Sequence, residues 1–193
     1  IGLDFARVLR AFLRQDPDII LVGETRDTET AKIAVEAALT GHLVFTTLHA
    51  NDAPSAFMRL MEMGIEPFLI STSVIGVIAQ RLVRKICPAC KEPFRPDSAT
   101  TRFLGLPDTI ELYRNVGCEA CGFTGYKGRI GVYEVLSVSD KIRRLVAEGS
   151  DTQVIREEAV ANGMKTLKDY CISLLREGLT AVDEVIRTVA IQP

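Results

Sequence analysis

Asp16-Pro-Asp-Ile-Ile-Leu-Val-Gly-Glu-Thr-Arg-Asp27 is the first of two segments that decide the fold, and the second is Thr40-Gly-His-Leu-Val-Phe-Thr-Thr-Leu-His-Ala-Asn-Asp52. In the first segment the apolar run Ile19–Val22 predicts a strand buried on both faces, as in parallel sheets, and Leu43–Thr47 predicts a second buried strand. The residues between them have helical spacing and stop at Gly41. This order predicts a strand–helix–strand unit and an α/β domain.

A carboxylate and an imidazole follow the two predicted strands. Glu24 lies just past the first strand and His49 just past the second. In open parallel sheets, ligands bind beyond the carboxyl ends of the strands, so this pair suits a site that attacks or senses a phosphate. The residues alone also allow structural roles for both side chains. Glu24 could cap a helix or pair with Arg26 or Arg7, and His49 could hydrogen-bond a nearby carbonyl group. His42 precedes its strand and is assigned a structural role.

From Cys87 to about Gly128 the sequence is rich in Pro, Gly, Cys and charged residues and has weak periodicity. Arg129–Ser137 predicts one further strand, and the remainder is expected to be helical. Thr28 is the expected N-cap of the helix that ends at Gly41. The composition is that of an ordinary globular protein, with 47% apolar and 25% charged residues and a net charge of −2, so it gives no general attraction to nucleic acid or membranes. The remaining helices are expected over Asp4–Leu13, Pro54–Met63, Pro67–Val83, Asp140–Ala147, Asp151–Ala161 and Leu167–Arg176.

Four of the five cysteines form two Cys-x-x-Cys pairs, Cys87 with Cys90 and Cys118 with Cys121. Two such knuckles present four thiolates, which suits a structural zinc ion in a reducing compartment such as the cytoplasm. The alternatives are reduced cysteines that bind nothing, or a redox pair, although a redox pair normally opens a helix in a thioredoxin-like fold. Cys171 lies on an apolar helical stripe and is expected in the core.

Basic residues gather around the two knuckles in the sequence. A solvated face is one interpretation, and a surface for an inner-membrane platform protein or acidic lipid head groups is another. A zinc-ribbon nucleic-acid binder is disfavoured by the scarcity of aromatic residues there and by the lack of net positive charge. The residues concerned are Arg81, Arg84, Lys85, Lys91, Arg95, Arg102, Lys127 and Arg129.

The two opening segments resemble the Walker B and histidine boxes of the secretion ATPases, the hexameric motors of type II secretion and type IV pilus assembly. The resemblance continues through Ala79-Gln-Arg-Leu-Val-Arg-Lys85, the cysteine region and Gly178-Leu-Thr-Ala-Val-Asp-Glu-Val-Ile-Arg187. It implies the C-terminal part of a RecA-like parallel-sheet ATPase domain with an inserted tetracysteine zinc subdomain and a C-terminal helical bundle. The regions it implies are an ATPase core over 1–86, a zinc subdomain over 87–128, and a strand with the helical region over 129–193.

By this resemblance, Glu24 is the Walker B glutamate that polarises the attacking water, and His49 faces the phosphate. Arg26 and Asp27 complete the Walker B neighbourhood as cofactor-binding residues. The resemblance also implies ATP, magnesium and zinc as cofactors, a homo-hexamer, an inner-membrane platform protein as partner, and no nucleic acid. The location implied is cytoplasmic, peripheral on the inner membrane face. Either pilus assembly or type II secretion fits, whereas retraction motors generally lack the tetracysteine region.

One departure from the family pattern is large, because the phosphate loop Gly-x-x-x-x-Gly-Lys-[Ser/Thr] does not occur in these 193 residues. That loop supplies most of the positioning and charge neutralisation in phosphoryl transfer. We therefore expect a C-terminal fragment that begins after the Walker A motif, is monomeric or weakly associated, and neither binds ATP tightly nor hydrolyses it alone. The alternative is a non-enzymatic, zinc-stapled adaptor derived from such an ATPase.

Overall fold

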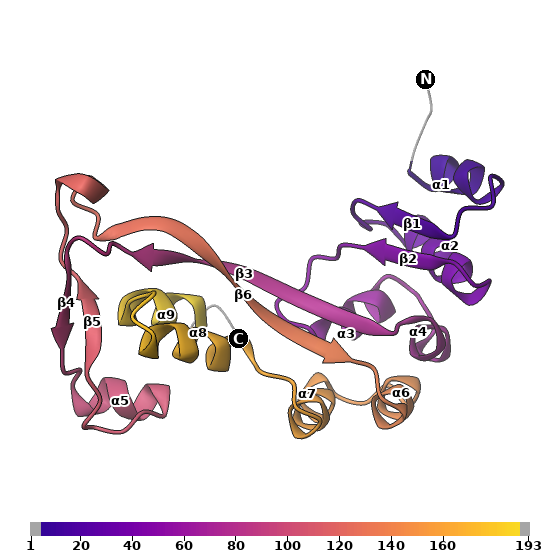
Figure 1. The fold of residues 1–193 in the computed structure, drawn as a ribbon. Helices are drawn as coiled ribbons and strands as arrows, with labels where there is room; N and C mark the ends of the chain where they lie inside the picture. Colours follow the sequence, from indigo (N-terminus) through magenta and orange to yellow (C-terminus); the bar gives the residue numbers. More distant parts are fainter. Residues whose placement is uncertain (1–4, 190–193) are drawn as a thin grey trace. The chain divides into compact units, whose positions relative to one another are not determined.

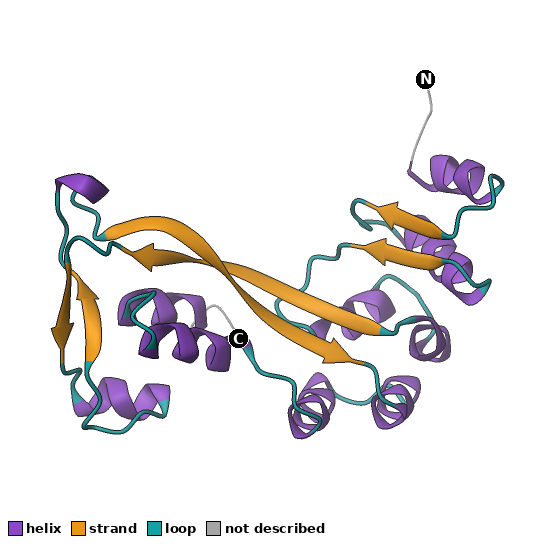
Figure 2. Cartoon of the chain, viewed as in Figure 1, coloured by secondary structure: helices purple, strands orange, loops and turns teal. Residues whose placement is uncertain are grey.

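The computed structural model describes residues 5–189, and the chain divides into two compact units (Figures 1 and 2). The first unit contains the chain up to residue 79 together with residues 135–164. The second contains residues 80–134 and the chain from residue 165 onward. Each unit therefore draws on two separate stretches of sequence. Among the described residues, no helix combines the length and the apolar character needed to cross a bilayer.

The first unit begins with the predicted strand–helix–strand motif, which is confirmed. Helix α1 (Phe5–Leu13) precedes strand β1 (Ile19–Val22), helix α2 (Thr28–Leu39) and strand β2 (Leu43–Thr46). The expected helix start at Asp4 lies outside the described residues. The two strands pair in parallel, from Ile19 opposite Leu43 to Val22 opposite Thr46. One face of this pair packs against α1 and α2 in a core formed by Ala6, Leu9, Ile20, Val22, Ile33, Ala34 and Ala37.

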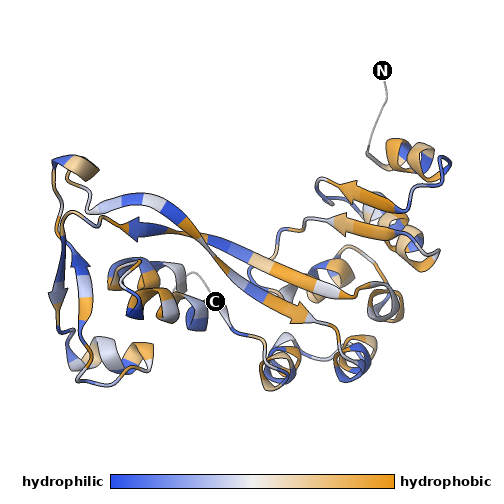
Figure 3. Cartoon of the chain, viewed as in Figure 1, coloured by the Kyte–Doolittle hydropathy of each residue, from blue (hydrophilic) through white to orange (hydrophobic). Residues whose placement is uncertain are grey.

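The expectation that both strands are buried on two faces is wrong. Ile19 and Leu21 are 62% and 75% exposed, and their register partners Leu43 and Phe45 are also exposed. Helices α1 and α2 pack on the opposite face, and within residues 5–189 these four side chains are exposed. Figure 3 shows the hydrophobic colouring of both strands. The continuous apolar pattern thus marks a sheet with one covered face.

A second core of the first unit lies among four more helices. They are α3 (Ser55–Glu62), α4 (Pro67–Ser73), α6 (Asp140–Ala147) and α7 (Thr152–Ala161), and the predicted helices over 54–63, 140–147 and 151–161 are confirmed. Their packing buries Phe57, Leu60, Ile70, Ile142, Val146, Ile155 and Ala159. This core holds the segment that follows β2 against the later helices α6 and α7.

The expected helix over Pro67–Val83 is wrong beyond Ser73. Helix α4 ends there, and Gly76–Ile86 forms the strand β3. The hydroxyl groups of Ser71, Thr72 and Ser73 donate to carbonyl groups of the preceding turn, which competes with continued helix formation. The β-branched residues that follow favour a strand. The strand predicted over 129–137 is confirmed within β6 (Tyr126–Ser137), which pairs with β3.

The second unit combines a small antiparallel sheet with helices. Strands β4 (Lys91–Phe94) and β5 (Leu112–Asn115) pair, and the other elements are α5 (Ser98–Leu104), the 3₁₀ turn η1 (Glu119–Cys121), α8 (Leu167–Arg176) and α9 (Val182–Val189). The predicted helix over 167–176 is confirmed. Its core contains Val83, Leu104, Leu112, Val132, Leu174, Leu175, Val185 and the fully buried Cys171, as expected for that cysteine. The later helices thus pack in two different cores, and a single C-terminal bundle is not confirmed.

A buried glutamate fixes α9 within the second unit. The side chain of Glu184 is fully buried and accepts hydrogen bonds from the backbone N–H and the guanidinium Nε of Arg84, at 2.9 and 2.8 Å. The guanidinium of Arg187 also donates, at 2.8 Å, to the oxygen that accepts from the backbone N–H of Arg84. Burial opposes ionisation, but these bonds hold the pKa of Glu184 below its usual range. The C-terminal helix is therefore attached to β3 through charged hydrogen bonds.

Candidate functional site

Glu24 and His49 lie together beyond the carboxyl ends of β1 and β2. Strand β1 ends at Val22 and strand β2 at Thr46, so parallel pairing brings the two following segments side by side. The Nε2 atom of His49 lies 2.6 Å from Oε1 of Glu24. The guanidinium of Arg26 lies 2.5 Å from the other carboxylate oxygen. The structure thus joins an acid, an imidazole and a guanidinium at the sheet edge where the sequence placed them.

The environment keeps Glu24 ionised. The hydrogen bond from Arg26 is the largest influence and lowers the pKa of Glu24, burial acts in the opposite direction, and the nearby His49 lowers it further. Oε1 of Glu24 is buried and has no well-aligned hydrogen-bond donor, because the ring nitrogen of His49 is close but not directed at it. The side chains of His49 and Arg26 are 79% and 73% exposed. The ionised carboxylate of Glu24 therefore lies between two accessible groups, with the imidazole of His49 near one oxygen and the guanidinium of Arg26 on the other.

Asp27 is the N-cap of α2, in place of the expected Thr28. Its two carboxylate oxygens accept from the backbone N–H of Thr30 at 2.8 Å and from the hydroxyl of Thr30 at 2.9 Å. These bonds lower the pKa of Asp27. Asp27 is the N-cap instead of Thr28 because its carboxylate, one residue earlier, reaches the free N–H groups of the first helical turn. Its contacts in this structure are those of a cap, and its role in cofactor binding stays a prediction.

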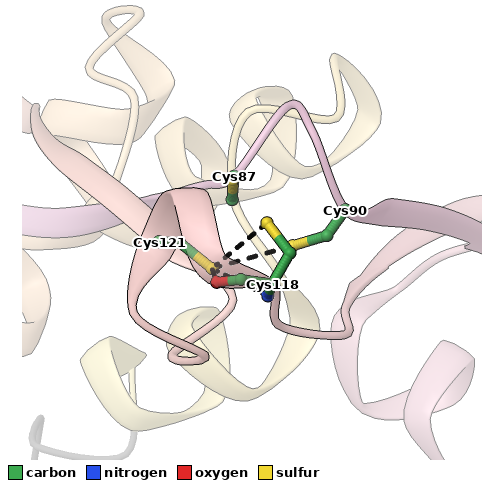
Figure 4. Close-up of side chains that lie close together, drawn as sticks. All are labelled: Cys87, Cys90, Cys118 and Cys121. Carbon is green, nitrogen blue, oxygen red and sulfur yellow. Dashed lines mark hydrogen bonds between the residues drawn. The ribbon is translucent and has the colours of Figure 1, made fainter.

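The two cysteine pairs converge in the second unit. The four sulfur atoms of Cys87, Cys90, Cys118 and Cys121 all lie within 4.8 Å of one another (Figure 4). Sγ of Cys121 is 3.9 Å from that of Cys90 and 3.8 Å from that of Cys118. Four thiolates at Zn–S distances of about 2.3 Å form a tetrahedron with sulfurs about 3.8 Å apart. The spacing of this donor set fits a tetrahedral zinc ion.

Backbone N–H groups surround these sulfur atoms. The amide of Gly117 donates to Cys90 Sγ at 3.3 Å, and the amides of Cys118 and Gly125 donate to Cys121 Sγ at 3.2 and 3.3 Å. The amide of Cys118 is the largest influence that lowers the pKa of Cys121 to about 6, whereas desolvation raises the pKa of Cys90 to about 12. Such N–H···S bonds are the usual support of a thiolate ligand. These four cysteines are a group that could hold a metal ion.

Comparison with known proteins decides the family. A family model described as "Type II/IV secretion system protein" matches residues 1–187. The chain belongs to this family. The resemblance seen in the Walker B and histidine boxes is thereby confirmed.

The curated relatives of this secretion-family chain are much longer than it is. It is 55% identical over 193 residues to the type IV pilus assembly ATPase PilB of Thermus thermophilus, covering 97% of this chain and 22% of that protein. It is 50% identical over 189 residues to type II secretion system protein E of Pseudomonas aeruginosa, covering 97% and 38%. The chain therefore spans 22% and 38% of the lengths of these two curated relatives.

Solved structures share the fold. A crystal structure of the pilus retraction motor PilT with bound ADP gives a TM-score of 0.67 at 29% identity, over 96% of this chain and 43% of that chain. The ATPase DotB of Legionella pneumophila gives a TM-score of 0.68 at 22% identity, over 97% of this chain and 42% of that chain. The predicted α/β class is confirmed by these neighbours.

His42 has the structural surroundings that its position predicted. Its Nδ1 lies 2.9 Å from the carbonyl oxygen of Ala37 and 3.2 Å from the hydroxyl of Thr40. Both partners belong to the end of α2, before β2 begins. The ring therefore joins the helix end to the strand start, away from the segments that follow the strands.

Sequence reasoning missed the role of Asp52, which ends the histidine segment. Asp52 is 6% exposed and accepts from the backbone N–H and hydroxyl of Ser55 at 2.9 and 2.6 Å, at the start of α3. Its other oxygen is 2.5 Å from the guanidinium of Arg156 on α7. An aspartate three residues before a serine that begins a helix favours bonds to the free N–H and hydroxyl groups there, but nothing local in the sequence identifies Arg156. The far end of the His49 segment is thus attached to α7.

Two of the basic residues around the cysteine knuckles are engaged within the second unit. The guanidinium of Arg84 lies 3.9 Å from the ring centre of Tyr126 and pairs with Glu184 at 2.7 Å. The ammonium of Lys91 lies 4.4 Å from the ring centre of Tyr113 and donates to a backbone carbonyl. These two charges stabilise the fold around the cysteines. Any docking role would rest on the other basic residues.

Proposed function

We propose that this chain is the water-activating and phosphate-sensing part of a motor ATPase that powers pilin or pseudopilin assembly. The observation that carries the proposal is the contact between Glu24 and His49, with Arg26 on the other carboxylate oxygen, at the end of two parallel strands. Family membership supports it, because the named relatives are assembly and secretion ATPases. Relatives of both kinds are close, so the proposal covers pilus assembly and type II secretion alike.

Each residue of the cluster has a chemical role in this proposal. Glu24 is ionised and can accept a hydrogen bond from a water molecule, so it orients and polarises the water that attacks the terminal phosphate. His49 is accessible and donates a hydrogen bond toward that phosphate or responds to its loss. Arg26 holds the Glu24 carboxylate in place, and Asp27 shapes the start of α2 next to it. Magnesium would neutralise charge on the phosphates.

The activity belongs to a longer protein in this proposal. The phosphate loop that cradles the nucleotide is absent from these 193 residues, and the chain spans a minority of its curated relatives. We infer that residues 1–86 complete an ATPase core with sequence outside this chain. The whole protein would act as a homo-hexamer on the cytoplasmic face of the inner membrane, against a platform protein. The isolated chain would be a monomer or weakly associated.

The four cysteines, within the region 87–128, would bind one structural zinc ion. Four protein ligands leave no open position for a substrate, so the ion would hold the two knuckles together and take no part in hydrolysis. The sulfur spacing and the N–H groups directed at Cys90 and Cys121 support this assignment.

A second candidate function is a non-enzymatic, zinc-stapled adaptor. It is favoured by one observation: the four sulfur atoms that could hold a metal all come from this chain. ATP hydrolysis separates the two candidates. A protein that joins this chain to a phosphate loop should hydrolyse ATP, and an adaptor should not. The isolated chain should show no micromolar affinity for ATP in a nucleotide titration, and tight binding would contradict the division of the site proposed above.

A further inference from the structure

Three threonines join the two segments that carry Glu24 and His49. The backbone N–H of Thr25 donates to the carbonyl of Thr47 at 3.0 Å, and the hydroxyl of Thr47 donates to the carbonyl of Gly23 at 2.7 Å. Thr47 therefore holds the backbone on both sides of Glu24. We call Thr25, Thr46 and Thr47 the threonine clasp.

The third contact of the clasp is a pair of hydroxyl groups. Oγ1 of Thr25 lies 2.7 Å from Oγ1 of Thr46, and Thr25 is only 3% exposed. A buried hydroxyl without a partner is costly, so this pair favours one register between the segments. Thr46 is also the last residue of β2, opposite Val22. The clasp thus extends the pairing of the two strands into the loops beyond them.

The clasp explains how an exposed histidine keeps a defined position. The His49 side chain is 79% exposed, so packing contributes little to its placement. His49 follows Thr47 by two residues, and Glu24 lies between the two residues that Thr47 bonds. Few backbone torsions therefore separate the clasp from the two functional side chains. We propose that Thr47, supported by Thr25, is a positioning residue that sets the Glu24–His49 contact, an inference that rests on the function proposed above.

A purely structural role predicts something different. If the hydroxyls only stabilised the strand pair, replacing Thr47 would lower stability without separating His49 from Glu24. Thr47 is exposed, so valine at this position opens no cavity in the core. Serine keeps the hydroxyl and is the matched control. The test therefore has to report on His49 itself.

The histidine content of the chain offers such a test. His49 and His42 are the two histidines, and His42 lies at the other end of β2 bonded to Ala37, so it serves as an internal control. The imidazole resonances of the 193-residue chain are recorded by NMR with and without Glu24→Gln. In the parent chain the substitution should shift the His49 resonances. In Thr47→Val that shift should fall to roughly half or less, as expected when coupled residues are separated, while Thr47→Ser keeps it.

Two results would overturn the proposal. One is a full Glu24→Gln response of His49 in Thr47→Val, and the other is a loss accompanied by equal changes at His42. Thr25→Val, which removes only the buried hydroxyl, should weaken the His49 response in the same direction, and no change there would remove Thr25 from the clasp. The measurement needs no nucleotide. Its failure therefore leaves the ATPase proposal standing, and failure of the ATPase proposal leaves the clasp measurement valid.

Discussion

The buried pair of Asp52 and Arg156 gives a quantitative prediction for the segment that carries His49. Asn at position 52 keeps the oxygen that accepts from Ser55 at the start of α3, but it loses the charge that meets Arg156 at 2.5 Å. Hydrogen bonds to charged groups contribute about 1.5–3 kcal/mol, so Asp52→Asn should cost about 2 kcal/mol. Asp52→Ala also removes the acceptor of the two Ser55 hydrogen bonds, which adds about 1 kcal/mol, for a total of about 3 kcal/mol.

Native-state hydrogen exchange is the suitable assay, because the chain has two packing units and a single unfolding curve would mix them. Protection of α3 and α7 amides should fall about 30-fold in Asp52→Asn and about 150-fold in Asp52→Ala, at about 1.4 kcal/mol per factor of ten. Asp151→Asn is the matched control, because Asp151 caps α7 through Gln153 on the exposed surface. Its cost should be near zero, since asparagine caps equally well.

The pH dependence of Asp52 follows from the direction of its pKa shift. Burial acts to raise the pKa of Asp52, but the bonds from Ser55 and Arg156 outweigh it and hold the pKa below its ordinary value of 3.8. The stability that ionised Asp52 contributes is therefore present above that ordinary value and is lost as the pH falls through the lower folded value. Asp52→Asn should lose this acid-range dependence. If the α3 and α7 amides were equally protected from hydrogen exchange in the parent chain and in Asp52→Asn at neutral pH, the stabilising role of the Asp52 charge would be wrong.

Two further predictions concern the second unit. Measured by native-state hydrogen exchange of α9 amides, Glu184→Gln should cost about 2 kcal/mol, because the fully buried carboxylate loses its charge opposite Arg84. Glu177→Gln on the exposed surface should be neutral in the same assay. The purified chain should contain one zinc ion by elemental analysis. The Cys90→Ser variant should lose the zinc ion. The Cys171→Ala variant should keep it, because Cys171 is buried in the core apart from the four-cysteine cluster. A parent chain without metal would contradict the zinc assignment.

Sequence reasoning succeeded where the determinant is local or follows from a simple topological rule. Glu24 and His49 were brought together by one rule, that parallel strands present their carboxyl ends at the same edge. The cysteine pairs are close because each knuckle is a short loop, although their convergence needed the β4–β5 pairing.

It failed where the decisive partner is distant in sequence or a pattern has two interpretations. Arg156 is 104 residues from Asp52, and no periodicity connects them. Apolar residues over 74–83 suit both helix and strand, and the choice was made by hydroxyl groups at the end of α4 and by pairing with β6. Ile19 and Leu21 have the apolar character of a doubly buried strand, yet packing against α1 and α2 covers one face only.

The central claim is that Glu24 activates water for ATP hydrolysis. The most direct test is the steady-state ATPase rate of a protein that carries this chain together with a phosphate loop, compared between Glu24→Gln and Glu36→Gln, an exposed glutamate on α2. Glu24→Gln should lower kcat by about 100-fold or more while nucleotide affinity is kept, and Glu36→Gln should have no effect. A Glu24→Gln protein that hydrolyses ATP as fast as the parent would contradict the claim.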